Sequence, residues 1–173
     1  AGLAMGDRYL SYLAHHASTA RTLATKLATR FVSDSPPSSL IDRMAAAYLA
    51  NDTQIVPMLT ALFSSTEFWA SGDAKTRRPL EDVTGCLRAI DPVPTTGLAD
   101  NALGFVFSLL GDMSHTTWDW APPNGYPDVA GAWVSASTLV RRWNFHWTTT
   151  RGQEPVLRPN PQFATQCAPV KGE

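Results

Sequence analysis

The chain has 173 residues, of which 44% are hydrophobic and 17% are charged, and its formal net charge is −1. That length and apolar content are typical of a globular protein that buries a sizeable core. A charge so close to zero gives no field that would attract nucleic acid or an anionic membrane. No apolar run reaches the roughly 18 residues of a membrane span.

Two cysteines, Cys86 and Cys167, lie far apart in the chain, and neither belongs to a CxxC pair. They predict no disulfide framework, and a single bridge between them is left open. Cys86 falls on the expected buried face of a helix, which favours a packed free thiol. No set of His, Cys and carboxylate residues has metal-ligand spacing, so we expect neither a metal nor a cofactor.

Apolar residues recur at intervals of three and four over the first 63 residues, which predicts four amphipathic helices. Asp7 is the expected N-cap of the first helix, and Asp52 of the fourth. Pro57 is awkward, because a proline past the first turn clashes with a carbonyl, so the fourth helix either starts just before it or has a distorted first turn. Phe68 and Trp69 are expected to fill the core. The helices run from Leu3 to His15, from Ser18 or Thr19 to Phe31, from Ser38 or Ser39 to Leu49, and over Ile55 to Phe63.

Two further helices follow. Residues 76–90 predict a helix with Pro79 near its first turn, where proline is tolerated. Residues 98–110 are apolar nearly all round, so this helix is expected to lie at the centre of the molecule. Gly111 suits the position just after its last residue.

A long loop, a last helix and a tail complete the chain. Residues 112–132 are rich in tryptophan and proline and predict an irregular loop. Ser135 or Ser137 is expected to cap the last helix. Residues 152–173 are polar and Pro-rich, which predicts an extended or disordered tail. One face of the last helix carries Leu139, Trp143 and Trp147.

These elements predict an all-α fold. We expect an irregular bundle of six to seven helices packed around residues 98–110, with the long Trp/Pro-rich loop packed against the last helix. Residues 1–151 are expected to form a single helical domain. Neither a repeat of 20–50 residues nor an alternating pattern that would demand a sheet is present.

The loop holds the strongest candidate for a ligand site. Trp118, Trp120 and Tyr126 have amides and carboxylates nearby, and flat aromatic faces stack on sugar rings while hydroxyls find polar partners. The alternative is that a long loop needs large side chains to pin it down. Trp133 and Trp143 are expected in the core, whereas Trp118 and Trp120 are the expected exposed pair.

The last helix offers a second set of candidates. Arg142 and His146 lie four residues apart, so they share a face beside the tryptophans and are candidate ligand-binding residues. His115 could approach them in space. The alternative is that Arg142 and Asn144 stitch the turn at Gly125 onto the helix. A Ser–His–Asp triad is left open, but no Gly-x-Ser-x-Gly elbow is present, and catalytic residues stay unassigned.

Arg78 and Glu81 lie three residues apart and can pair on one helix face. Arg77 and Arg78 could instead form an anion clamp, since arginine forks match carboxylate, sulfate or phosphate. We favour a structural salt bridge that ties this helix to the long loop. The expected structural clamp consists of Arg78, Glu81, Trp133, Trp143 and Asn144.

His15 and His16 end the first helix and could in principle bind a metal. Adjacent residues on a helix point about 100° apart, so both rarely reach one ion. A cationic helix end that suits the helix dipole is the favoured interpretation.

Several stretches together resemble a known family. Taken in order over about residues 3–148, these stretches resemble the C-terminal part of the bacterial domain-of-unknown-function 1800 family. Pro57 departs from the family pattern, as does His16-Ala17, where members often have His-Pro. The stretches are Leu10 to Asp34, Phe68-Trp69, Arg77-Arg-Pro-Leu-Glu, Gly125-Tyr-Pro-Asp, Ala132-Trp and Arg142-Trp-Asn-Phe.

The resemblance implies no activity and no catalytic residues. It implies an exported protein, periplasmic or at the cell surface, of which this chain is a fragment. The first hypothesis is therefore a helical module that binds a partner protein or a cell-surface polysaccharide. The alternatives are the C-terminal part of a hydrolase-like enzyme whose catalytic residues lie mostly in a missing N-terminal half, and a purely structural scaffold.

Overall fold

The computed structural model describes residues 2–94 and 99–166, and most of these are helical. The chain divides into two compact units, Ala1–Thr76 (unit 1) and Arg77–Glu173 (unit 2). Each unit has a hydrophobic core of its own. The all-α class is confirmed, and seven helices of the described residues are nine residues or longer, in agreement with the six to seven expected.

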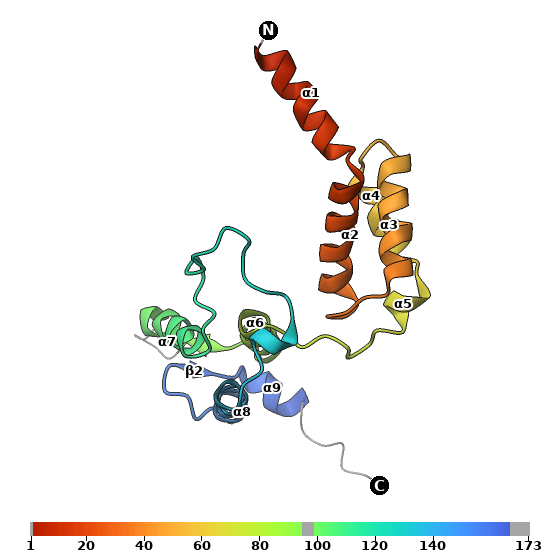
Figure 1. Cartoon of the computed structure of the whole chain (residues 1–173). Coiled ribbons are helices and arrows are strands. Elements are labelled where there is room, and N and C mark those ends of the chain that lie inside the picture. Colours follow the sequence, from red (N-terminus) through yellow and green to blue (C-terminus); the bar gives the residue numbers. More distant parts are fainter. Residues whose placement is uncertain (1, 95–98, 167–173) are drawn as a thin grey trace. The chain divides into compact units, whose positions relative to one another are not determined.

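Unit 1 consists of five helices (Figure 1). α2 and α3 lie side by side, and α4 packs on α3. The helices are α1 (Gly2–Ala14), α2 (Ala17–Phe31), α3 (Ser38–Ala50), α4 (Ile55–Phe63) and the short α5 (Thr66–Trp69).

The core of unit 1 is built on a stripe of alanines. Ala20, Ala24 and Ala28 recur every four residues on α2, and none of the three is exposed to solvent (0%). Side chains this small let two helix backbones approach closely, so larger residues of the partner helix fill the space. The buried residues that face this stripe are Leu40, Ile41, Met44 and Tyr48 of α3, with Met58 and Leu62 of α4.

Several helix starts differ from those expected. Asp7 lies inside α1, which begins at Gly2. The N-cap of α2 is His16, whose Nδ1 accepts a hydrogen bond of 3.2 Å from the Ser18 N–H. Pro37 precedes α3 without a side-chain cap. His16 and Pro37 are therefore the N-cap residues of two helices for which the sequence predicted a serine or threonine. An N-cap needs an extended backbone more than a particular side chain.

α4 accommodates Pro57 without distortion. The helix begins at Ile55, so Pro57 is its third residue. The first four N–H groups of a helix have no partner inside it, so a proline at this position loses no hydrogen bond. Beyond α4, Phe68 packs against the core as expected, but Trp69 is 76% exposed.

Unit 2 contains the longer connections. Its core consists of buried side chains from three helices, with Phe163 of a fourth packed against it. Its elements are α6 (Pro79–Ile90), β1 (Val93–Pro94), α7 (Ala99–Asp112), the 3-10 turn η1 (Ala130–Ala132), α8 (Ala136–Thr150), β2 (Leu157–Arg158) and α9 (Pro161–Gln166). The core residues are Val83, Cys86 and Ile90 of α6, Leu109, Leu110 and Met113 of and beside α7, and Phe145 of α8.

α7 is not the central helix that its composition predicts. Leu109 and Leu110 are buried, but Leu103 and Phe107 are 64% and 53% exposed. The helix also continues through Gly111 to Asp112. Its turn comes at Ser114, which takes the left-handed backbone (φ 56°) expected of a glycine.

The chain after α8 returns to the unit as a strap. β2 pairs antiparallel with β1, with Val93 opposite Arg158 and Pro94 opposite Leu157. The Asn160 N–H donates to the Ile90 carbonyl at 3.1 Å, and Leu157 is buried. Cys86 is a buried free thiol whose pKa is raised by burial. Cys167 lies outside the described residues, as does Leu98.

Candidate functional site

The start of α8 is fixed by a reciprocal cap, as the sequence predicts for Ser135. The Ser135 Oγ accepts from the Thr138 N–H at 3.2 Å, and the Thr138 Oγ1 accepts from the Ser135 N–H at 2.9 Å. This cap sets the register of the helix. Residues at positions 139, 142, 143, 146, 147 and 150 then follow the helical repeat and lie along one stripe.

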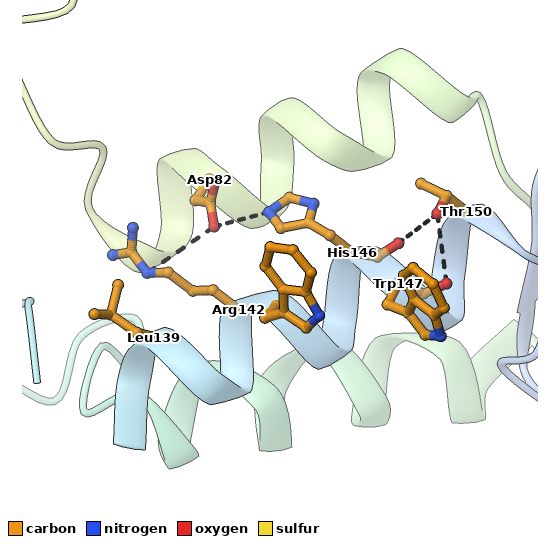
Figure 2. Close-up of a pocket in the computed structure, with 7 residues that line it drawn as sticks. Asp82, Leu139, Arg142, His146, Trp147 and Thr150 are labelled. Atoms are coloured by element: carbon orange, nitrogen blue, oxygen red, sulfur yellow. Dashed lines mark hydrogen bonds and ion pairs between the residues drawn. The ribbon is translucent and has the colours of Figure 1, made fainter. Parts of the chain in front are cut away.

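That stripe forms one wall of a groove of about 490 Å³ (Figure 2). The volume is within the roughly 300–1,000 Å³ of small-molecule sites. Asp82 of α6 reaches across from the other side. The lining residues from α8 are Leu139, Arg142, Trp143, His146, Trp147 and Thr150.

Asp82, Arg142 and His146 form the polar part of the groove. The Asp82 Oδ2 accepts a hydrogen bond of 3.1 Å from the His146 Nε2 and lies 4.0 Å from the Arg142 Nε. The side chains of Asp82 and Arg142 are 16% and 12% exposed, and that of His146 is 41% exposed. The carboxylate is therefore shared between a nearly buried cation and an accessible imidazole.

Arg142 is incompletely satisfied. Its Nε and Nη2 are buried and have no hydrogen-bond partner in the described part of the chain. Buried donors without partners are uncommon, because each costs roughly 1–3 kcal/mol of desolvation. A guanidinium in this state calls for a ligand or for a small movement of Asp82.

Two tryptophans supply the apolar part of the groove. Trp143 is 70% exposed and Trp147 is 47% exposed. The Arg151 guanidinium carbon lies 3.7 Å from the centroid of the Trp147 ring, a cation–π contact that occupies one ring face. A ligand therefore has the Trp143 ring and the opposite face of Trp147 to stack on.

A second cluster, around His115, holds the long loop. The imidazole is buried, and its Nδ1 accepts a hydrogen bond of 3.2 Å from the Leu80 N–H, which assigns the proton to Nε2. Its ring centroid is 4.6 Å from those of both Tyr126 and Trp133. Burial, followed by the positive charge of Arg78, lowers the pKa of His115 below its ordinary value of 6.5. The cluster therefore contains a neutral histidine.

The loop aromatics expected to bind a ligand separate into different environments. Trp118 is 96% exposed, with a left-handed backbone (φ 70°). Trp120 is 37% exposed, donates to the Asn124 Oδ1 at 3.1 Å and packs against Tyr126, with the two rings tilted by 43°. The Tyr126 hydroxyl donates to the Thr116 carbonyl at 2.7 Å. Tyr126 and Trp120 therefore pack within the loop, and Trp118 stands apart from them.

Arg78 fastens the loop to the start of α6. The guanidinium of Arg78 pairs with Glu81 at 2.6 Å and lies 3.9 Å from the Asp128 carboxylate of the loop. The Trp133 Nε1 donates to the Pro127 carbonyl at 2.8 Å. Arg78, Glu81 and the buried Trp133 therefore lie where the loop meets the start of α6.

Two members of the expected clamp lie elsewhere. Asn144 is exposed, and no side-chain hydrogen bond of Asn144 occurs within the described residues. Trp143, expected in the core, lines the groove instead. The helical repeat shows which residues share a face but not whether that face is covered, and Arg142 pairs with Asp82 rather than with the loop.

His15 and His16 are not brought together on one ion site. The His15 imidazole contacts the Ser11 carbonyl and the Asp52 carboxylate, while His16 caps α2. Within residues 2–94 and 99–166, no three His, Cys, Asp or Glu side chains are grouped as metal ligands. Across the same ranges, no helix combines the length and apolar character needed to cross a bilayer.

Sequence reasoning missed Asp82 as a site residue. It is 64 positions from His146, and an acidic residue in the first turn of a helix is explained by the helix dipole alone. The helical spacing predicts that Leu139, Trp143 and Trp147 share one face of the last helix, but it does not predict that this face is exposed to solvent. Nothing in the sequence identified Thr150 as a site residue. A threonine in a helix commonly donates to the carbonyl four residues earlier, as Thr150 does to that of His146.

These observations define a helical protein with an aromatic groove and a shared carboxylate between two helices. The chain matches the family model described as "Protein of unknown function (DUF1800)" over residues 1–168. The chain belongs to this family, which confirms the resemblance seen in its sequence. No curated protein matches the chain, and no solved structure does.

Proposed function

We propose that this chain is a helical binding module and that its α6–α8 groove binds a saccharide. The observation that carries the proposal is the pair of exposed tryptophans, Trp143 and Trp147, beside the polar cluster of Asp82, Arg142 and His146. Indole faces stack on the CH faces of sugar rings. Carboxylate, guanidinium and imidazole groups are suitable partners for the sugar hydroxyls.

The arrangement favours a chain of sugars over a single ring. Trp143 and Trp147 are one helical turn apart, so their Cβ atoms are separated by about 5–6 Å. Arg151 holds the Trp147 ring on one face and limits its rotation. Two stacking surfaces along one helix therefore offer consecutive subsites to an extended ligand.

The test is a saccharide-binding screen on the whole chain, repeated with Trp143→Ala and with Trp118→Ala. The first change should weaken binding about tenfold, since a central aromatic residue contributes more than about 1 kcal/mol. Trp118 is the matched control because it is 96% exposed and lies outside the groove. Equal losses in both variants, or a loss with Trp118→Ala alone, would contradict the proposal and favour the loop.

A partner protein is the other occupant expected from the sequence. If no saccharide binds, the same Trp143→Ala variant should be compared with the unaltered chain in a pull-down from an envelope extract. Loss of one defined band would favour a protein ligand. Unchanged recovery would leave the groove as part of a structural scaffold.

An enzymatic role is the second candidate, and one observation favours it. The Asp82 carboxylate accepts from the His146 Nε2 at 3.1 Å, which leaves the Nδ1 lone pair of an accessible imidazole free to accept a proton. The hydroxyl among the lining residues is that of Thr150, which donates to its own helix. A hydrolase built on this pair would therefore activate water. Asp82→Asn should abolish any oligosaccharide hydrolysis that the chain shows.

Export to the periplasm or the cell surface is also part of the proposal. Its support is the resemblance of residues 3–148 to a family whose members look like exported proteins. Fractionation of cells that make the natural protein checks it. Recovery with the envelope fractions is the expected result, and recovery with cytoplasmic markers would contradict it.

A further inference from the structure

The unused edge of the Arg142 guanidinium indicates the charge of the ligand. The Nε and Nη2 nitrogens, which lie on the same edge, are the two buried donors that lack a hydrogen-bond partner in the described chain. That edge is one of the two with which arginine binds a carboxylate through two parallel hydrogen bonds. The unpaired donors are therefore arranged as a fork.

Asp82 does not fill that fork. Its Oδ2 is 4.0 Å from the Nε of Arg142, beyond hydrogen-bond distance, and accepts from His146 instead. The neighbouring cation Arg141 is engaged elsewhere, at 2.8 Å from the Asp112 carboxylate. Arg142 is thus the arginine of this helix that has donors to offer the groove.

A second guanidinium lies beside the groove. Among the described lining residues, Arg142 and Asp82 carry one charge each, and Arg151 lies over the Trp147 ring. Because Asp82 accepts a hydrogen bond from His146, the unpaired donors of Arg142 are left for an acceptor that the ligand brings.

We infer that the ligand is an acidic saccharide, of the uronic acid class, whose carboxylate binds the Nε and Nη2 edge of Arg142. This inference rests on the proposed saccharide function. The planar fork matches a carboxylate, while Trp143 and Trp147 receive the ring that bears it. Because both nitrogens lie below the surface, ligand binding requires a lining side chain to change its rotamer.

The test uses matched acidic and neutral ligands. Oligosaccharides of galacturonate, glucuronate and mannuronate are titrated into the whole chain by calorimetry, each beside its methyl ester, which keeps the ring and removes the charge. The acid should bind about tenfold more tightly than its ester, as expected for a charge-assisted bidentate contact. The preference should shrink as salt is raised.

Two arginine variants locate the effect. Arg142→Gln should abolish the preference for the acid, and Arg141→Gln should keep it, because Arg141 pairs with Asp112 outside the groove. Circular dichroism checks that Arg142→Gln is folded. If it is not, the acid and ester titrations of the unaltered chain decide the question alone.

The outcomes separate the two claims. Acid and ester that bind equally would overturn the acidic class and leave saccharide binding intact. A preference that survives in folded Arg142→Gln would also overturn it. If neither form of any of the three sugars binds, both the acidic class and the inference from Arg142 are wrong, and the neutral saccharides of the wider screen decide the proposed function.

Discussion

Both units of this chain have a hydrophobic core, but the buried polar side chains of unit 2 are less completely hydrogen-bonded. Unit 1 packs three alanines of α2 against large residues of α3 and α4. Unit 2 has a long aromatic loop and a groove, and it contains the buried side-chain N and O atoms that lack a partner in the described chain. These are Nε and Nη2 of Arg142 and Oγ1 of Thr149. The unsatisfied atoms thus all belong to the helix that lines the groove, which is where a binding function is expected to cost stability.

The separate cores predict separate unfolding, and a core substitution gives the largest effect. Leu40 is fully buried in α3 (0%). Leu40→Ala should lower the free energy of unfolding of unit 1 by about 2–5 kcal/mol, because a cavity remains. Leu49→Ala is the control on the same helix, since Leu49 is 36% exposed.

Two spectroscopic signals distinguish the units. Five of the six tryptophans follow residue 77, so their fluorescence reports on unit 2, whereas circular dichroism reports on the helices of both. Leu40→Ala should lower the midpoint of the circular dichroism transition that belongs to unit 1. The midpoint of the fluorescence transition, which reports on unit 2, should not change. If both signals shift together, residues 1–151 unfold as the single domain expected from the sequence.

The alanine stripe of unit 1 should tolerate no enlargement. Ala24→Leu forces extra volume between α2 and its neighbours, and a loss of about 1–3 kcal/mol in the free energy of unfolding is expected. Ala46→Leu, on an exposed position of α3, should change it by less than about 0.5 kcal/mol. Chemical denaturation measures both. Similar values for the two variants would mean that the helices of unit 1 are less closely packed than described.

Removing the unsatisfied hydroxyl of unit 2 should change the free energy of unfolding by less, and in the opposite direction. Thr149 is fully buried (0%), and its Oγ1 has no partner in the described chain. Thr149→Val keeps the shape and removes the polar atom, so the free energy of unfolding should stay the same or rise by up to about 1 kcal/mol. The neighbouring Thr148 donates to the Asn144 carbonyl at 2.8 Å, so Thr148→Val should lower it. Destabilisation by Thr149→Val would reveal a partner for that hydroxyl.

The two units should respond to pH with opposite signs, which is the smallest effect. Hydrogen bonds to the Ser11 carbonyl and Asp52 raise the pKa of His15, so its contribution is complete below pH 6.5 and is lost as pH rises through the raised value. Burial lowers the pKa of His115, so its contribution is complete above pH 6.5 and is lost as pH falls through the lowered value.

Melting curves of the two histidine variants measure this difference. His115→Gln should flatten the acid side of the stability curve of unit 2, and His15→Gln the alkaline side of that of unit 1. The same slopes in the variants and in the unaltered chain would mean that other groups control the pH dependence.

The sequence predicts those features that depend on neighbours along the chain. The helical repeat located α2, α3 and α8, and the hydroxyl of Ser135 marked the start of α8. It also grouped Trp143 with Trp147 and Arg142 with His146. These groupings follow from geometry within one helix and need no knowledge of the rest of the fold.

Features that depend on distant residues were not predictable. The exposure of Trp143 depends on what packs over α8, and the contact between Asp82 and His146 joins residues 64 positions apart. The sequence allowed His115 to approach Arg142, whose charge does act on it, but the hydrogen bond of His115 to the Leu80 N–H depends on the path of the loop. The sequence therefore predicted the site only in part. It grouped the residues on one face of α8, but it did not predict that Asp82 lies on the opposite side of the groove.

The most direct test of the central claim follows the indole N–H signals of the tryptophans by nuclear magnetic resonance during a saccharide titration. If the α6–α8 groove is the site, the signals of Trp143 and Trp147 shift together along one binding curve, while those of Trp69 and Trp118 stay in place. Shifts confined to Trp118 and Trp120, with Trp143 and Trp147 unchanged, would place the site in the loop and contradict this account.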